Sequence, residues 1–192
     1  MTRVLRPLFL ALGLLAALGP VRAASDLAAL VPAQSEISFV SRQMGVPVSG
    51  SFRSFDAQVR FDPAHPQTGQ FTIGVDLGSV QLPTNDATQE IVRPTWFDAA
   101  RYPRAVFESS SVRVLERGRY EVQGRLSIKG HAQDVVVPVA LEQAAGLTVA
   151  SGALVVHRLA FEIGDGEWAD TSLVADEVQI RFRLALSGIG PI

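Results

Sequence analysis

Cysteine is absent from all 192 residues of the chain. Its absence excludes a disulfide framework, catalysis by a thiol and metal sites built on thiolates, so the hydrophobic core alone must hold the fold. Positive charge is also scarce, because 17 Lys and Arg stand against 19 Asp and Glu, for a formal net charge of −2. Proteins that bind nucleic acid need a basic patch for the phosphates, so no nucleic-acid partner is expected.

Signatures of catalysis and of metal binding are missing as well. The chain has no Gly-x-Ser-x-Gly nucleophile elbow and no glycine-rich loop that follows an expected strand and opens a helix. The histidines, His65, His131 and His157, fall in separate strand–turn regions, whereas a zinc site needs three or four convergent ligands. The acidic stretch Asp165–Asp170 lacks the spacing of a calcium-binding EF-hand and is interpreted as a solvated turn. We therefore expect no catalytic residue, no metal and no cofactor.

Residues 1–23 have the layout of a secretory signal peptide. Arg3 and Arg6 precede an apolar run over residues 7–18, and Val21-Arg22-Ala23 suits cleavage by a signal peptidase. The alternative is a membrane anchor, but a spanning helix needs about 20 apolar residues and this run is shorter. We predict export to the periplasm, cleavage after Ala23, and a single mature domain over residues 24–192 with no stable membrane insertion. Loss of three Arg residues would take its formal charge from −2 to −5.

An alternating pattern typical of β-strands recurs along most of the chain. In Arg119–Leu141, two runs of alternating apolar residues flank a tight turn at Lys129-Gly130-His131. Alternation with a period of two places one face on a core and the other toward water. Further runs of this kind lie at residues 35–41, 48–61, 71–77, 104–115, 147–161 and 178–186. A change of parity predicts a bulge near Arg53-Ser54 in the second of these runs.

The alternation breaks between Leu82 and Pro103. Thr84-Asn85-Asp86 supplies residues that favour a helix N-cap, and Pro94 suits the first turn of a helix. We expect a short helical insertion around residues 84–100, as two short helices or one broken helix, across the mouth of a barrel.

About eight antiparallel strands favour an all-β fold that closes into a barrel, because closure leaves no unpaired edges. The interior of such a barrel is filled by side chains or holds one small ligand. Small residues assigned to the inward rows, Ala57, Gly124 and Ala153, would leave room for a ligand or fit the taper of a solid core. Alternation alone leaves both interpretations open.

Several motifs, in a fixed order, are typical of one family. Trp96-Phe97-Asp98-Ala99-Ala100-Arg101-Tyr102-Pro103 is followed by Phe107-Glu108-Ser109, and then by Gly124-Arg125-Leu126-Ser127-Ile128-Lys129-Gly130. Over about Ser35–Leu186 the chain resembles the YceI-like family of secreted bacterial lipid-binding proteins. It departs from the family at Ile91–Trp96, where the family often has a charged or polar residue with Leu before a Phe-Phe-Asp motif. The departure bears on the identity of the ligand more than on the fold.

The resemblance implies a lipocalin-like barrel with an elongated apolar cavity for a polyisoprenoid chain, such as an isoprenoid quinone or a polyprenyl phosphate. It also implies a periplasmic location, a possible homodimer and no catalytic residues. Burial of each CH₂ group contributes roughly 0.8 kcal/mol, so an apolar tunnel can bind such a chain with few polar contacts. The residues expected to bind the ligand are Phe39, Phe55, Val59, Phe71, Ile73, Trp96, Phe97, Phe107, Val122, Leu126, Val137, Arg158 and Phe182.

Four arginines are candidates for the ligand headgroup, because a guanidinium can pair with a phosphate or donate to a quinone oxygen. They are Arg93, Arg101, Arg104 and Arg158. The alternative for each is a solvated charge or an ion pair with Asp86, Asp98 or Glu108, and for the aromatic residues it is plain core packing. Three functions thus remain: a periplasmic carrier of an isoprenoid lipid, which we favour, an enzyme acting on a lipid-derived substrate, and an interaction module with a solid core.

Overall fold

The computed structural model describes residues 27–192, so the predicted signal peptide lies outside the described residues. The strands are β1 Leu27–Leu30, β2 Glu36–Gln43, β3 Val46–Phe52, β4 Phe55–Arg60, β5 Gln70–Asp76, β6 Val80–Gln81, β7 Arg104–Glu116, β8 Arg119–Ile128, β9 His131–Ala144, β10 Leu147–His157 and β11 Glu177–Ser187. Helix α1 spans Asn85–Ile91, and short 3₁₀ helices lie at Pro32–Gln34, Pro66–Thr68, Leu77–Ser79, Arg158–Phe161 and Gly166–Ala169.

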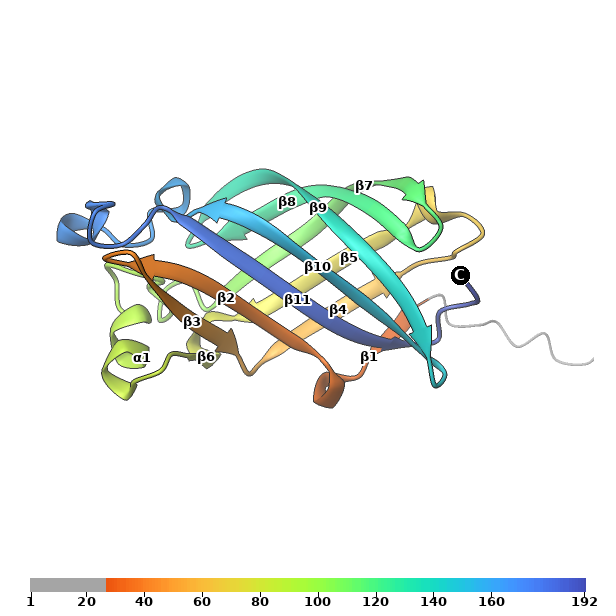
Figure 1. The fold of residues 1–192 in the computed structure, drawn as a ribbon, viewed down its shortest axis with the longest axis horizontal. Coiled ribbons are helices and arrows are strands. Elements are labelled where there is room, and N and C mark those ends of the chain that lie inside the picture. The colour runs from red at the N-terminus through yellow and green to blue at the C-terminus, as the bar shows by residue number, and fades with distance from the viewer. Residues whose placement is uncertain (1–26) are drawn as a thin grey trace, which may run out of the picture.

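The strands form a closed antiparallel barrel (Figure 1). Its circuit of eight runs β1-β4-β5-β7-β8-β9-β10-β11 and closes where Ala29 and Leu30 of β1 pair with Ser187 and Leu186 of β11. Strand β2 pairs with β11 further along, β3 pairs with β2, and β6 pairs with β3. Strands β1 and β2 therefore both pair with β11, β1 near its C-terminal end and β2 nearer its start. The predicted all-β barrel of about eight strands is confirmed.

The hairpin of β8 and β9 agrees with its alternation. Tyr120, Val122, Gly124, Leu126 and Ile128 are buried, whereas the residues that alternate with them are exposed or half-buried. At the turn, Lys129 and Gly130 both have positive φ, 51° and 80°, which is the backbone of the tight turns that match strand twist. The period of two therefore identified both the hairpin and its inward face.

Three details of the strand prediction are wrong. Residues 48–61 contain no bulge at Arg53-Ser54: the strand ends there, since β3 pairs with β2 and β6, whereas β4 pairs with β1 and β5. The run over residues 147–161 ends as a strand at His157 and continues as a 3₁₀ helix. Ala153 is not an inward residue, because Ala150, Leu154 and Val156, of the opposite parity, line the interior of β10.

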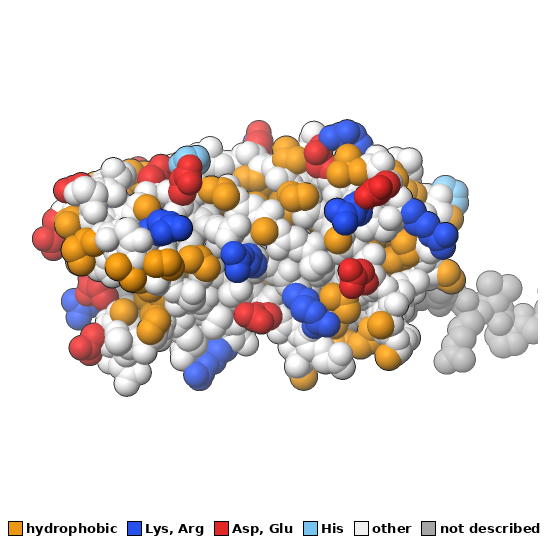
Figure 2. All heavy atoms as spheres, in the orientation of Figure 1, with side chains coloured by type: hydrophobic (Ala, Val, Ile, Leu, Met, Phe, Trp, Pro, Cys, Tyr) orange, Lys and Arg blue, Asp and Glu red, His pale blue; other side chains and the backbone are white. Residues whose placement is uncertain are grey.

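The helical insertion lies at one end of the barrel, opposite the C-terminal residues (Figure 1). The Thr84 hydroxyl accepts a hydrogen bond from Ala87 N at 3.2 Å and caps α1, as the sequence predicted. The rest of the insertion is turns rather than a second helix, and Pro94 lies in them. On the face shown in Figure 2, basic side chains are interspersed with Asp and Glu.

Candidate functional site

The barrel encloses a cavity of about 660 Å³. This volume lies within the range of small-molecule sites, roughly 300–1,000 Å³. Its wall is almost entirely apolar and comes from nearly every strand. At the α1 end the lining includes Gln43, Asp86, Glu90 and Trp168. Because Gln43 and Asp86 are also exposed to solvent, the mouth of the cavity lies at this end.

The structure gathers the predicted ligand-binding residues around this cavity, with one exception. Phe55, the first residue of β4, packs against the core but does not line the cavity. The residues that line it are Phe39, Val59, Phe71, Ile73, Trp96, Phe97, Phe107, Val122, Leu126, Val137, Arg158 and Phe182. Contact of these side chains with a ligand remains a prediction.

Sequence reasoning missed other lining residues for two different reasons. Ile37 and Tyr120 lie on the inward parity of their strands, so alternation could have identified them, whereas Phe52 is on the opposite parity to Phe55 because β3 ends at Phe52. Trp168 and Ile189 lie in irregular segments, where no period relates sequence position to direction. Only the folded chain shows that these segments cover the two ends of the barrel.

Three phenylalanine rings of the cavity wall lie over glycines of a neighbouring strand. A Cβ atom placed on Gly50 would come within 2.3 Å of the Phe39 ring, and one on Gly152 within 2.5 Å of the Phe182 ring. Gly124 stands in the same relation to Phe107, at 2.6 Å. Since the glycines have no side chain, the rings lie along the wall instead of projecting into the cavity. The arrangement favours an open interior over a solid core.

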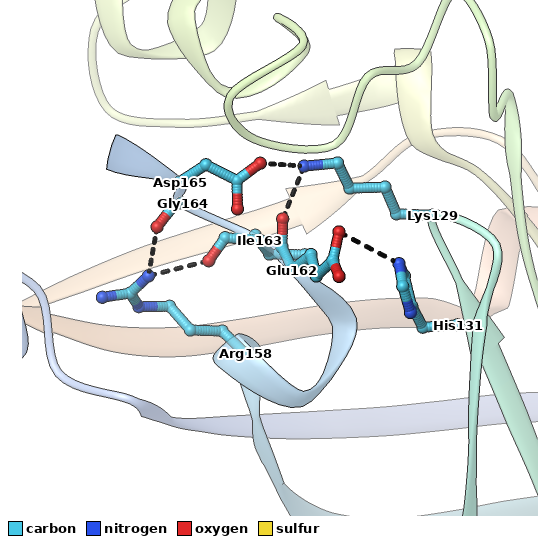
Figure 3. A network of polar contacts seen from close by, with 7 residues as sticks. All are labelled: Lys129, His131, Arg158, Glu162, Ile163, Gly164 and Asp165. Carbon is cyan, nitrogen blue, oxygen red and sulfur yellow. Dashed lines mark hydrogen bonds and ion pairs between the residues drawn. The ribbon is translucent and has the colours of Figure 1, made fainter. Parts of the chain in front are cut away.

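Arg158 organises the segment that borders the mouth (Figure 3). Its side chain is 2% exposed, and burial lowers the pKa of its guanidinium, an effect that the charge of Asp176 opposes. The guanidinium donates to five backbone carbonyls: Ile163, Gly164, Trp168, Val174 and Ala175. These bonds tie residues 163–175 to the start of the segment, so Arg158 acts as a positioning residue.

Lys129, the one lysine in the sequence, fixes the same segment from the β8–β9 turn. Its ammonium group donates to the Glu162 carbonyl and to the Asp165 carboxylate, the latter at 3.0 Å (Figure 3). His131 Nε2 lies 3.3 Å from a carboxylate oxygen of Glu162. The segment over residues 158–176 is thus attached to the barrel on two sides.

Two tryptophans meet beside the mouth. The ring centroids of Trp96 and Trp168 are 5.4 Å apart, and the Arg158 guanidinium lies 5.8 Å from the Trp96 ring. Trp96 Nε1 is buried and has no hydrogen-bond partner among the described residues. Such a buried, unpaired donor is uncommon in folded proteins.

The other candidate arginines are not part of the cavity wall. Arg93 pairs with Glu90 at 3.1 Å, Arg104 pairs with Asp56, and Arg101 lies 5.1 Å from the ring of Tyr102. The partners Glu90 and Asp56 are not those that the sequence suggested. The charged residues that do line the cavity are therefore Asp86, Glu90 and Arg158, whose guanidinium is already saturated with carbonyls.

Each histidine lies beside a single carboxylate. His65 pairs with Asp62 at 2.8 Å, and the same distance separates His157 from Asp176. Over residues 27–192, no three His, Cys, Asp or Glu side chains are grouped so as to hold a metal ion. In the same range no helix has the length and hydrophobicity needed to cross a bilayer.

Comparison with known proteins identifies the family. The model of the YceI-like domain family matches residues 29–186. A UPF0312 protein of Vibrio cholerae is 27% identical over 106 residues, which are 55% of this chain and 56% of that protein. A UPF0312 protein of Azotobacter vinelandii is 28% identical over 88 residues, 46% of each chain. The chain thus spans about half the length of the curated relatives it matches.

Solved structures agree with this assignment. The crystal structure of BcnA from Burkholderia cenocepacia is 43% identical, with a TM-score of 0.79 over 81% of this chain and 98% of that chain. A polyisoprenoid binding domain from Saccharophagus degradans, implicated in plant cell wall breakdown, has a TM-score of 0.66 at 15% identity, over 84% of this chain and 98% of that one. The second likeness shows a shared fold.

Proposed function

Because the chain belongs to the YceI-like family, we propose that it is a periplasmic carrier that holds an isoprenoid lipid inside its barrel. The observation that carries the proposal is the apolar cavity of about 660 Å³. A neighbour of the same fold is a polyisoprenoid binding domain, which supports the class of ligand. The carrier function is sequestration and needs no catalytic step. The signal-peptide layout of residues 1–23 supports the periplasmic location.

The chemistry of the wall fits a long hydrocarbon chain. Roughly 25 cal/mol is gained for each Å² of apolar surface removed from water, so a chain enclosed by Leu126, Val137 and Phe182 binds through burial. The open wall, with its rings laid over glycines, supports a bound ligand over a solid interaction module. A homodimer stays a prediction.

The mouth favours a neutral headgroup, such as a quinone, over a phosphate. Two carboxylates, Asp86 and Glu90, line it, and they would repel a phosphate. The Arg158 donors are occupied by carbonyls, and Arg93 is paired with Glu90. The free donor at Trp96 Nε1 suits a single carbonyl or hydroxyl oxygen. We therefore propose an isoprenoid quinone or polyprenol as the cargo.

The test is to extract the natively exported protein with organic solvent and to identify bound lipid by mass spectrometry. We expect a stoichiometric isoprenoid quinone or polyprenol. A protein that carries no lipid, and that takes up none when offered quinones and polyprenols, would overturn the proposal.

Two adjacent residues of β9 provide a matched pair of variants. Val137 lines the cavity and is 6% exposed, whereas Val136 points outward and is 51% exposed. We expect Val137→Trp to lower lipid uptake at least about tenfold, because the indole would occupy the tunnel, at an overpacking cost of about 1–3 kcal/mol. Val136→Trp should bind lipid as the parent protein does. Equal uptake by the two variants, both folded by circular dichroism, would place the lipid outside the barrel.

A further inference from the structure

Residues 188–192, which follow β11, lie at the end of the barrel opposite α1 (Figure 1). Gly188 has a φ of 89°, a conformation that favours glycine, and it turns the chain away from the strand. The next residue, Ile189, packs against the core cluster of this end and lines the main cavity. Ile189 is thus part of the floor of the cavity.

A second hollow lies on the other side of Ile189. It has a volume of about 310 Å³ and is lined by Ile189, Pro191 and residues 143–147 of the β9–β10 hairpin. Ile189 is the residue that contacts both hollows. Ile189 therefore lies at the boundary between the interior of the barrel and a surface pocket.

Besides the packing of Ile189, three side-chain hydrogen bonds hold this segment in place. The Gln143 side chain donates to the Gly190 carbonyl at 2.7 Å and accepts from Ile192 N at 3.1 Å. Arg117 donates to the Ile192 carbonyl at 2.7 Å. All three bonds are exposed, and a typical hydrogen bond contributes only about 1 kcal/mol net. The segment can therefore open locally while the barrel stays folded.

We infer that Ile189 determines the length of the isoprenoid chain that the barrel accepts, an inference that rests on the proposed carrier function. A chain that fits the main cavity ends against Ile189. A longer chain must displace residues 188–192 and extend into the second hollow. Binding of a longer chain therefore breaks the hydrogen bonds that Gln143 and Arg117 make with this segment. The affinity for long chains is thus lower than the apolar area of the chain that is buried would give.

The experiment measures dissociation constants of the full-length protein for three prenyl alcohols of increasing length: farnesol, geranylgeraniol and solanesol. Competition with a fluorescent apolar probe gives each constant. The quantity of interest is the affinity for solanesol relative to that for geranylgeraniol. We expect Ile189→Gly to raise this ratio about tenfold, which corresponds to about 1.4 kcal/mol. Ile189→Trp places a larger side chain at the floor of the cavity, so it should obstruct long chains and lower the ratio.

Gln143→Ala provides a second route to the same result, because it releases the segment while leaving Ile189 intact. The matched control is Gln123→Ala, at an exposed glutamine of β8 whose side chain contacts Ser111 on the outer face. Thermal melts confirm that each variant folds. If the parent protein binds prenyl alcohols but the ratio is the same in all the variants, Ile189 is not the floor, and the carrier function stands. If the parent protein binds none of the alcohols, the carrier function itself fails.

Discussion

Arg158 shows how one residue can be assigned two different functions. As a sequence position it was a candidate for the headgroup, since guanidinium groups bind phosphates. In the structure its N–H groups point to the carbonyls of its own segment, and 2% of the residue is exposed. The two functions predict different consequences of its removal, so they can be separated by experiment.

We expect Arg158→Met to lower the free energy of unfolding by about 3 kcal/mol or more, because buried carbonyls lose their donors at about 1–3 kcal/mol each. Urea denaturation measures the change. The matched control is Arg181→Met on the outer face of β11, where the guanidinium is exposed and the expected change is within about 0.5 kcal/mol. Full stability of Arg158→Met with loss of lipid binding would instead make Arg158 a ligand contact.

At the scale of elements, pairs of strands shape the cavity. Gly152 of β10 lies directly opposite Phe182 of β11, and Gly50 of β3 lies opposite Phe39 of β2. When a glycine on one strand lies beside an aromatic ring on the next, the pair helps to fix the register between the two strands, and the ring covers the backbone of the glycine. The same pairing determines how much of the barrel interior stays empty.

Gly152→Ala should therefore reduce the cavity. The new methyl group would meet the Pro138 backbone carbonyl at 2.3 Å and the Phe182 ring at 2.5 Å, so the backbone of β9 must shift and the ring must swing inward. We expect uptake of prenyl alcohols to fall several-fold, with a loss of stability of about 1–3 kcal/mol from overpacking. Gly152→Ala combined with Phe182→Leu should regain part of the uptake, because the smaller side chain leaves room. Unchanged uptake in Gly152→Ala would mean that this ring does not limit the cavity.

The elements also show which features the sequence could predict. The hairpin of β8 and β9 was predicted with its inward face because its alternation is long and ends in a turn whose geometry is local. The end of the strand at Arg53-Ser54 resembles a bulge in the sequence, since a change of parity looks the same whether or not a strand changes neighbours. Ala153 was misplaced because alternation does not reveal which parity of a two-sided apolar run faces inward.

The candidate site also has a part that the sequence predicts and a part that it does not. Most of its wall follows from strand parity, and all of the predicted residues except Phe55 line the cavity. The two ends do not follow from parity. Trp168 reaches the mouth through the carbonyl network of Arg158, and Ile189 reaches the floor through a turn at Gly188. Both residues lie in irregular segments outside the strands, so their positions depend on turns and side-chain contacts that alternation does not predict.

At the scale of the whole molecule, the two ends of the barrel differ in how firmly they are held. The mouth segment is attached by a buried guanidinium and by the nearly buried ammonium of Lys129. The floor segment is attached by exposed bonds to Gln143 and Arg117. Exposed hydrogen bonds open more readily than buried ones, so the floor is the less stable of the two ends.

A ligand that bridges both ends should stabilise the whole barrel. Binding to the folded state alone adds about 2.7 kcal/mol at a free ligand concentration of 100 Kd, and in a domain of this size each kcal/mol raises Tm by about 2–4 °C. We therefore expect removal of the bound lipid to lower Tm by several degrees, and re-addition of a polyprenol to restore it, as measured by calorimetry. Val137→Trp serves as the control, because the indole obstructs its tunnel and its Tm should respond less to lipid than that of the parent protein. Since a ligand that binds only the folded state must stabilise it, a parent protein whose Tm is the same with and without saturating lipid would show that the folded barrel does not bind the lipid, whereas an equal rise in Tm in the parent protein and in Val137→Trp would place the lipid outside the cavity.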